Sequence, residues 1–191
     1  MSFEGYRIRK LAHFCEGRDR LLDLGWAQQP NPYLHNSEVI GLDLERADPP
    51  ANYAGAFEGD VMNLPHPFEP ESFDAIHAGE LLEHLEDPIR FLRNCLDTLK
   101  PGGILVLSTP NPNSPWERLL TLTLSRRFFY TEHHVCLYPQ RWLIRMLERS
   151  GFTDVRLLSG GIQSPFGLVP FPRPWCWVRI HTAAPTETRP S

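Results

Sequence analysis

The stretch FDAIHAGELLEHLEDPIRFLRNCLDTLKPGGILVLSTPN, residues 73–111, decides the fold. The short apolar run that begins at Phe73 predicts a buried strand. Asp87 and Pro88 then supply an N-cap and a proline at the first helical position. An apolar stripe at spacings of three and four residues predicts an amphipathic helix after them; it consists of Ile89, Leu92, Leu96 and Leu99.

The same stretch ends in a second strand. Lys100-Pro101-Gly102-Gly103 terminates the helix, and the branched run 104–107 is typical of a parallel strand that is buried on both faces. A strand, a helix and a second strand in one sheet form a right-handed crossover. Ligands of such sheets lie at the carboxyl ends of the strands, so the polar residues 77–84 and 108–111 border the expected site.

Further strands and helices are predicted on both sides of this crossover. Apolar runs predict strands at 20–25, 39–44, 56–61, 155–158 and 177–182, and helices at 3–15 and 139–150. In the last helix, Trp142, Leu143, Met146 and Leu147 are expected to face inward. The alternation predicts a doubly wound α/β sheet of seven strands, with shortened helices after the first two strands because prolines occupy both connections. We expect one domain over 1–182, with an inserted segment at 113–135 and a disordered tail at 183–191.

Composition restricts the classes of protein to which the chain could belong. The 191 residues suffice for one domain with a full core. A net charge of -4 argues against a nucleic-acid partner. The four cysteines are scattered without metal-type pairing, and neither a signal peptide nor a run of about 18 apolar residues is present. A reduced, cytoplasmic protein is therefore expected.

Several motifs together resemble the class I S-adenosylmethionine-dependent methyltransferases. They are Asp23-Leu24-Gly25, Asp43, Asp60, FDAIHAGELLEHL and LKPGGILVLSTPN, and the resemblance covers roughly residues 20–152. The subgroup of ubiquinone-pathway O-methyltransferases and bacterial small-molecule and glycan methyltransferases looks most similar. The resemblance implies a seven-stranded sheet with an antiparallel last strand. The first turn departs from the family pattern, because Gly25-Trp26-Ala27-Gln28-Gln29-Pro30 stands where a run such as GCGTG is usual.

The resemblance also implies how S-adenosylmethionine is bound. The backbone of the first turn would receive the methionine part, and residues 78–80 would lie beside it and the reacting methyl. Asp43 would accept both ribose hydroxyls, and Asp60 would hold the adenine amine. The implied cofactor-binding residues are Asp23, Gly25, Trp26, Ala27, Asp43, Leu44, Asp60, Val61, Met62, Ala78 and Gly79.

Glu80, Glu83 and His84 are spaced so that they share one face of a helix. Some members of the resembled family look similar here and use these side chains, with a later histidine, to bind a divalent cation. His133 and His134 are the later histidines of this chain, and Mg²⁺ or Mn²⁺ would suit the carboxylate and imidazole ligands. The alternative is a solvated turn without metal, in which His84 or His134 is a general base or a structural histidine. The candidate catalytic residues are Glu80, His84 and His134, and the candidate metal ligands are Glu80, Glu83, His84 and His134.

The methyl acceptor is expected to be a small molecule, a lipid-linked intermediate or a sugar, methylated on oxygen. Residues 116–130 could form a substrate lid, a peripheral membrane contact or an additional packed helix. Residues 166–177 could line an apolar acceptor pocket or an ordinary loop. Two other functions stay open: a non-catalytic scaffold with the methyltransferase fold, and a metal-dependent RNA 2′-O-methyltransferase.

Overall fold

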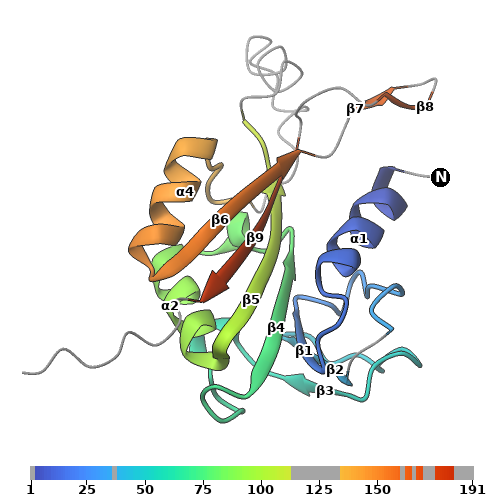
Figure 1. Cartoon of the computed structure of the whole chain (residues 1–191). Helices are drawn as coiled ribbons and strands as arrows, with labels where there is room; N and C mark the ends of the chain where they lie inside the picture. Colours follow the sequence, from blue (N-terminus) through green and yellow to red (C-terminus); the bar gives the residue numbers. More distant parts are fainter. Residues whose placement is uncertain are drawn as a thin grey trace, which may run out of the picture.

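One sheet of seven strands organises the chain (Figure 1), and its order is β3-β2-β1-β4-β5-β9-β6. The computed structural model describes residues 3–35, 38–112, 134–159, 162–164, 167–169 and 175–182. Strands β1 to β5 are parallel, whereas β9 is antiparallel to both β5 and β6. The predicted doubly wound α/β fold is therefore confirmed. The strands of this sheet are β1 (Arg20–Leu24), β2 (Glu38–Asp43), β3 (Gly55–Glu58), β4 (Phe73–Gly79), β5 (Leu99–Pro110), β6 (Phe152–Ser159) and β9 (Trp175–Thr182).

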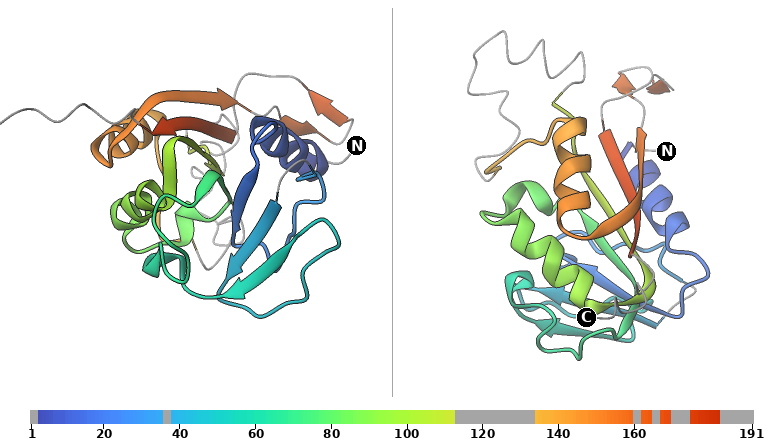
Figure 2. Two further views of the ribbon diagram at one scale, coloured as in Figure 1. Left: turned by 60° about the horizontal axis from the view of Figure 1, so that its bottom comes forward. Right: turned by 60° about the vertical axis from the view of Figure 1, so that its left-hand side comes forward.

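Helices cover both faces of the sheet (Figure 2). Helix α1 (Phe3–Phe14) lies on one face, and α2 (Pro88–Thr98) and α4 (Gln140–Arg149) lie on the other. Strand β5 contributes to both apolar cores: Leu105 and Leu107 pack on the side of α2 and α4, whereas Ile104 and Val106 pack on the side of α1. This double burial explains the continuous apolar run in the sequence. A separate two-stranded ribbon consists of β7 (Ile162–Ser164) and β8 (Gly167–Val169).

Helix α2 begins as predicted, since the Asp87 side chain accepts a hydrogen bond from the backbone N–H of Arg90 at 3.0 Å. Its buried face is rotated from the predicted stripe, however. Phe91, Leu92 and Cys95 are buried, whereas Ile89 is 38% exposed. A phenylalanine ring buries more apolar surface than a first-turn isoleucine, and the helix turns accordingly.

Helix α4 shows a similar correction. Leu143 and Leu147 are fully buried against the sheet, as predicted. Trp142, which was expected to face inward, is 65% exposed. Two leucines four residues apart already define the packed stripe, and the preceding residue points about one quarter-turn away from it.

Shortened helices were predicted after β1 and β2, but the described residues 25–35 and 44–54 contain no helix. The prolines in both connections account for this difference, and α1 covers this flank instead. Strand β3 ends at Glu58, earlier than predicted, and Val61–Asn63 forms a short 3₁₀ helix, η1. The predictions for residues 116–130 and 183–191, and most of those for 113–135 and 166–177, lie outside the described residues. Within the described part of the chain, every helix is too short or too polar to cross a bilayer.

Candidate active site

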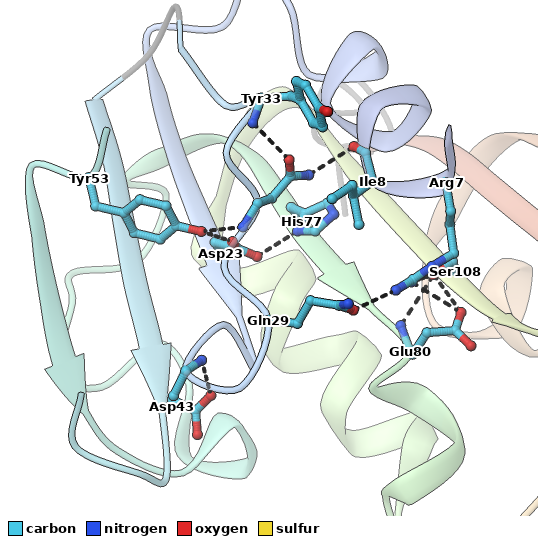
Figure 3. A network of polar contacts seen from close by, with 12 residues as sticks. Arg7, Ile8, Asp23, Gln29, Tyr33, Asp43, Tyr53, His77, Glu80 and Ser108 are labelled. Atoms are coloured by element: carbon cyan, nitrogen blue, oxygen red, sulfur yellow. Dashed lines mark hydrogen bonds and ion pairs between the residues drawn. The ribbon is translucent and has the colours of Figure 1, made fainter. Parts of the chain in front are cut away.

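The carboxyl ends of β1, β2, β4 and β5 bring together the side chains that the sequence singled out (Figure 3). The first turn follows β1, and Asp43 ends β2. Glu80 follows β4, and Ser108 lies near the end of β5. Parallel sheets of this kind bind their ligands at this edge.

The first turn accommodates its tryptophan by burying the side chain. Gly25 has a φ of +72°, a conformation that favours glycine, and its N–H donates to Leu42 O at 3.0 Å. Trp26 is 2% exposed and packs on Tyr53, with 5.4 Å between the ring centroids. Its indole lies directly over Gly41, where an added Cβ would come within 2.4 Å of Nε1. Only the backbone of Trp26 therefore borders the expected cofactor site.

Asp43 connects this turn to the end of β2. Its Oδ2 accepts a hydrogen bond from the Ala27 N–H at 2.8 Å, and its Oδ1 accepts one from the Glu45 N–H at 3.0 Å. A carboxylate has about four lone-pair sites, so both oxygens keep capacity for the two hydroxyls of a ribose. Leu44, next in the chain, has an exposed side chain beside them.

The predicted adenine residues follow directly from this end of β2. The Gly59 N–H donates to Asp43 O at 2.8 Å, which places the start of this segment beside the carboxylate. Asp60 caps η1 by accepting a hydrogen bond from the Met62 N–H at 2.8 Å. Val61 is buried in the core and Met62 packs against that core. The segment therefore combines the Asp60 carboxylate with apolar side-chain atoms, as an adenine site requires.

Arg7 is a site residue that sequence reasoning missed. This arginine of helix α1 is buried, and it donates hydrogen bonds to Ser108 Oγ and Gln29 Oε1, both at 2.9 Å. Its Nη1 lies 3.5 Å from Glu80 Oε1, which also accepts a hydrogen bond from Ser108 Oγ at 2.7 Å. Arg7 thereby connects the first turn to the ends of β4 and β5. No local pattern in the sequence predicts this contact.

Asp23 and His77 form a second missed pair beneath the edge. They are register partners on β1 and β4, and His77 Nδ1 lies 2.5 Å from Asp23 Oδ1. The Tyr53 hydroxyl donates to the other oxygen of Asp23, and burial followed by the charge of Asp23 raises the pKa of Tyr53. Both oxygens of the Asp23 side chain therefore bind buried residues of the domain, and only the backbone of Asp23 leads into the first turn.

Glu83, His84 and His134 lie together on the other side of the edge. Their possible ligand atoms lie within 4.8 Å of one another, and His134 Nε2 is 4.0 Å from Glu83 Oε1. Glu83 is fully buried, and its carbonyl accepts hydrogen bonds from Val135 and Cys136, at 2.8 and 3.2 Å. These hydrogen bonds hold the extended segment that follows His134 against the 3₁₀ helix η2 (Leu82–His84).

Glu80 does not join this group, which corrects the predicted helical face. Its φ is +52°, and the 3₁₀ helix η2 begins only at Leu82, so Glu80, Glu83 and His84 do not follow α-helical spacing. Glu80 turns instead toward Arg7 and Ser108. His133 lies outside the described residues. The described candidate cation ligands are thus one carboxylate and two imidazoles.

Burial raises the pKa of Glu83 to about 8, with a further contribution from the charge of Glu80. Between its ordinary value of 4.5 and about 8, the folded chain keeps a proton that the unfolded chain has released. Stability should therefore fall as pH rises through this range, by up to about 1.4 kcal/mol per pH unit. Glu83→Gln should flatten the decline in urea unfolding measured at pH 5, 6, 7 and 8. The exposed Glu86→Gln is the control, and an equal slope in wild type and Glu83→Gln would contradict the assignment.

Comparisons with known proteins agree with this architecture. Residues 6–157 match a family model described as methyltransferase domain. A probable S-adenosylmethionine-dependent methyltransferase of Mycolicibacterium smegmatis is 34% identical over 152 residues, 75% of this chain and 55% of that protein. A ubiquinone biosynthesis O-methyltransferase of Xanthomonas campestris is 54% identical over 43 residues, 22% of this chain and 18% of that protein. The chain thus spans about half, or less, of the length of these relatives.

The fold has a solved counterpart at low sequence identity. The crystal structure of a SAM-dependent methyltransferase from Archaeoglobus fulgidus superposes with a TM-score of 0.73 and 18% identity, covering 95% of each chain. The family model extends over most of the sheet that carries Asp43 and Glu80. The chain therefore belongs to the class I S-adenosylmethionine-dependent methyltransferases.

Proposed function

We propose that the chain transfers a methyl group from S-adenosylmethionine to an oxygen of a small-molecule, lipid-linked or sugar acceptor. The observation that carries this proposal is the inward position of Trp26. Because the indole packs over Gly41, the backbone of the altered first turn and the Asp43 carboxylate both stay at the carboxyl edge. The later glycines of the usual pattern are thus absent, while the backbone of the turn keeps its place beside Asp43.

The residues at the edge fit the parts of this cofactor. Asp43 has spare acceptor capacity for the ribose hydroxyls, and Asp60 with Val61 and Met62 supplies a carboxylate and apolar atoms for adenine. The sulfonium of S-adenosylmethionine supplies the activated methyl. The chain must then hold the acceptor oxygen in line with the methyl carbon and the sulfur, and must exclude competing geometries.

In this proposal, His84 or His134 would accept the proton of the acceptor hydroxyl. Their rings are in edge contact, with 4.8 Å between centroids, and the buried carboxyl of Glu83 lies behind His134. As the acceptor oxygen bonds to the methyl carbon and the carbon–sulfur bond breaks, the hydroxyl proton would pass to an imidazole nitrogen. Above its raised pKa of about 8, Glu83 is ionised and would stabilise the resulting imidazolium.

Replacing His84 with alanine should lower turnover by about 10²-fold while leaving cofactor affinity unchanged, because general-base catalysis contributes at least this much. Transfer of a labelled methyl group to a panel of hydroxyl-bearing acceptors measures turnover, and calorimetry measures affinity. His66→Ala, at an exposed position before β4, is the matched control. Equal turnover in wild type and His84→Ala would remove His84 from the site. Transfer to amines or carbon acids but not to hydroxyls would contradict O-methylation.

We further propose that Glu83, His84 and His134 bind a divalent cation that orients the acceptor hydroxyl. The supporting observation is that one possible ligand atom from each of the three side chains lies within 4.8 Å of the others, with the Glu83 carboxyl fully buried. A cation would satisfy this carboxylate and lower the pKa of a bound hydroxyl. With two imidazoles and one carboxylate, Mn²⁺ suits the group better than Mg²⁺, which prefers oxygen ligands.

Titration of Mn²⁺ alone, followed by the electron paramagnetic resonance of the free ion, tests this cation site. Wild type should bind one Mn²⁺, and Glu83→Gln should weaken binding by about tenfold or more, as losses of metal-site residues commonly do. Glu86→Gln should bind as wild type does. Absence of binding at millimolar Mn²⁺, or equal binding by Glu83→Gln, would leave the two histidines as metal-free bases.

A further inference from the structure

A buried imidazole nitrogen at the carboxyl edge has no hydrogen-bond partner. His77 is 5% exposed, and within the described residues nothing bonds to its Nε2. Leaving a buried polar atom unpaired costs free energy, so such atoms in native proteins usually meet a ligand or a bound water.

The contacts of His77 Nδ1, on the opposite side of the imidazole ring, determine whether Nε2 donates or accepts a hydrogen bond. Asp23 Oδ1 faces His77 Nδ1 at 2.5 Å, and Asp23 Oδ2 accepts the Tyr53 hydroxyl (Figure 3). A carboxylate only accepts hydrogen bonds, so we assign Nδ1 as the donor of this pair. In the neutral ring Nε2 is then a hydrogen-bond acceptor, held in a fixed direction by β1 and β4.

The space over Gly79 is where this acceptor can meet a ligand. Gly79 ends β4, and a Cβ added there would lie 3.7 Å from His77 Nε2 and 3.4 Å from Arg7 Nη1. Glycine therefore keeps open a position that both side chains border. Asp23 and Glu80 contribute negative charge around it and Arg7 contributes positive charge, which leaves one negative charge in excess. A cationic hydrogen-bond donor matches this environment.

We propose that His77 Nε2 accepts a hydrogen bond from the α-ammonium group of the cofactor's methionine moiety. This inference rests on the proposed function, because S-adenosylmethionine brings that ammonium to the carboxyl edge. The ammonium provides both an N–H donor for His77 Nε2 and a positive charge that balances the carboxylates of Asp23 and Glu80. A neutral hydroxyl would supply only the first. His77 is thus a binding residue for the amino-acid end of the cofactor, and Asp23 is the positioning residue that orients it.

Three ligands separate this contact from the rest of the cofactor site. S-adenosylhomocysteine carries the ammonium, its deaminated analogue lacks it, and 5′-methylthioadenosine lacks the whole amino-acid end. In calorimetric titrations, His77→Phe should weaken S-adenosylhomocysteine binding by about tenfold or more, since a hydrogen bond to a charged group is lost. Affinity for the other two ligands should stay within about twofold of wild type, because they never make the contact.

A matched variant controls for general damage to the buried network. Tyr53→Phe removes one donor to Asp23 and keeps the Asp23–His77 pair, so it should change the affinity for all three ligands by the same factor. A second measurement needs no substitution. The ¹⁵N chemical shift of His77 Nε2 in the wild-type chain should move on adding S-adenosylhomocysteine and should not move with 5′-methylthioadenosine.

The outcomes distinguish this inference from the proposed function. If His77→Phe weakens all three ligands equally, or if Nε2 shifts equally with both nucleosides, the contact to the ammonium is wrong while cofactor binding stands. A wild-type chain that binds none of the three ligands overturns both. Selective loss of S-adenosylhomocysteine affinity, together with a selective shift of Nε2, supports the assignment of His77.

Discussion

Gly41→Ala is expected to destabilise the fold by about 1–3 kcal/mol, the usual cost of overpacking a core. An added Cβ would meet three atoms of the Trp26 indole at 2.4–2.7 Å, and the indole is itself buried against Tyr53. The first turn would have to move to relieve the clash. Urea unfolding of the purified variants measures the change in the free energy of unfolding.

Gly55→Ala is the matched control, because Gly55 lies on the adjoining strand β3 and an added Cβ there meets nothing within 4 Å. Gly41→Ala should cost less in a Trp26→Ala background than in wild type, because the clash is then absent. A double-mutant coupling of about 0.5–3 kcal/mol is expected. If Gly41→Ala costs no more than Gly55→Ala, Trp26 does not lie over β2.

Asp43→Ala should weaken binding of S-adenosylmethionine and S-adenosylhomocysteine by more than about tenfold, because each hydrogen bond to a charged group contributes about 1.5–3 kcal/mol. Two effects add here: the ribose loses its acceptor, and the N–H groups of Ala27 and Glu45 lose theirs. Calorimetric titration of the variant measures the dissociation constants.

Asp43→Asn separates the two effects. Its amide oxygen can still accept the Ala27 N–H and keep the first turn in place, but it has one acceptor oxygen where the carboxylate has two. An affinity between those of wild type and Asp43→Ala is expected. Glu45→Ala should bind as wild type does, since Asp43 contacts the backbone of Glu45. A dissociation constant that Asp43→Ala leaves unchanged would contradict the ribose assignment.

Local sequence patterns predicted most of the elements that position the site. Asp87 and Pro88 begin α2, and the branched run in β5 is buried on both faces. Asp43 ends β2 beside the first turn, as expected. These features depend on residues close together in the sequence and on a periodicity that the sheet imposes, so they can be predicted without coordinates.

Contacts between distant side chains could not be predicted in this way. From the sequence alone, the bulk of Trp26 suggests that the first turn is blocked. In the structure the indole packs over Gly41 of β2, fifteen positions later in the sequence, and so lies away from the turn. A glycine inside a central strand is a signal of close approach, yet it does not name its partner. Arg7 and His77 are further examples, because Ser108 and Asp23 are their partners only through the strand order.

The candidate catalytic group was predicted only in part. A helical face for Glu80, Glu83 and His84 assumes a regular α-helix, whereas Glu80 adopts a left-handed conformation before a 3₁₀ turn. Arg7 and Ser108 hold its carboxylate there, which compensates for the backbone strain. His134 joins Glu83 because two backbone N–H groups beyond it bond to the Glu83 carbonyl.

The most direct test of the central claim is a calorimetric titration of the wild-type chain with S-adenosylmethionine and S-adenosylhomocysteine. Micromolar binding of both is expected, because Trp26 is packed away from the edge and Asp43 stays beside the first turn. No heat and no thermal shift at millimolar concentrations of either ligand would contradict the account, and would favour a non-catalytic scaffold with the methyltransferase fold.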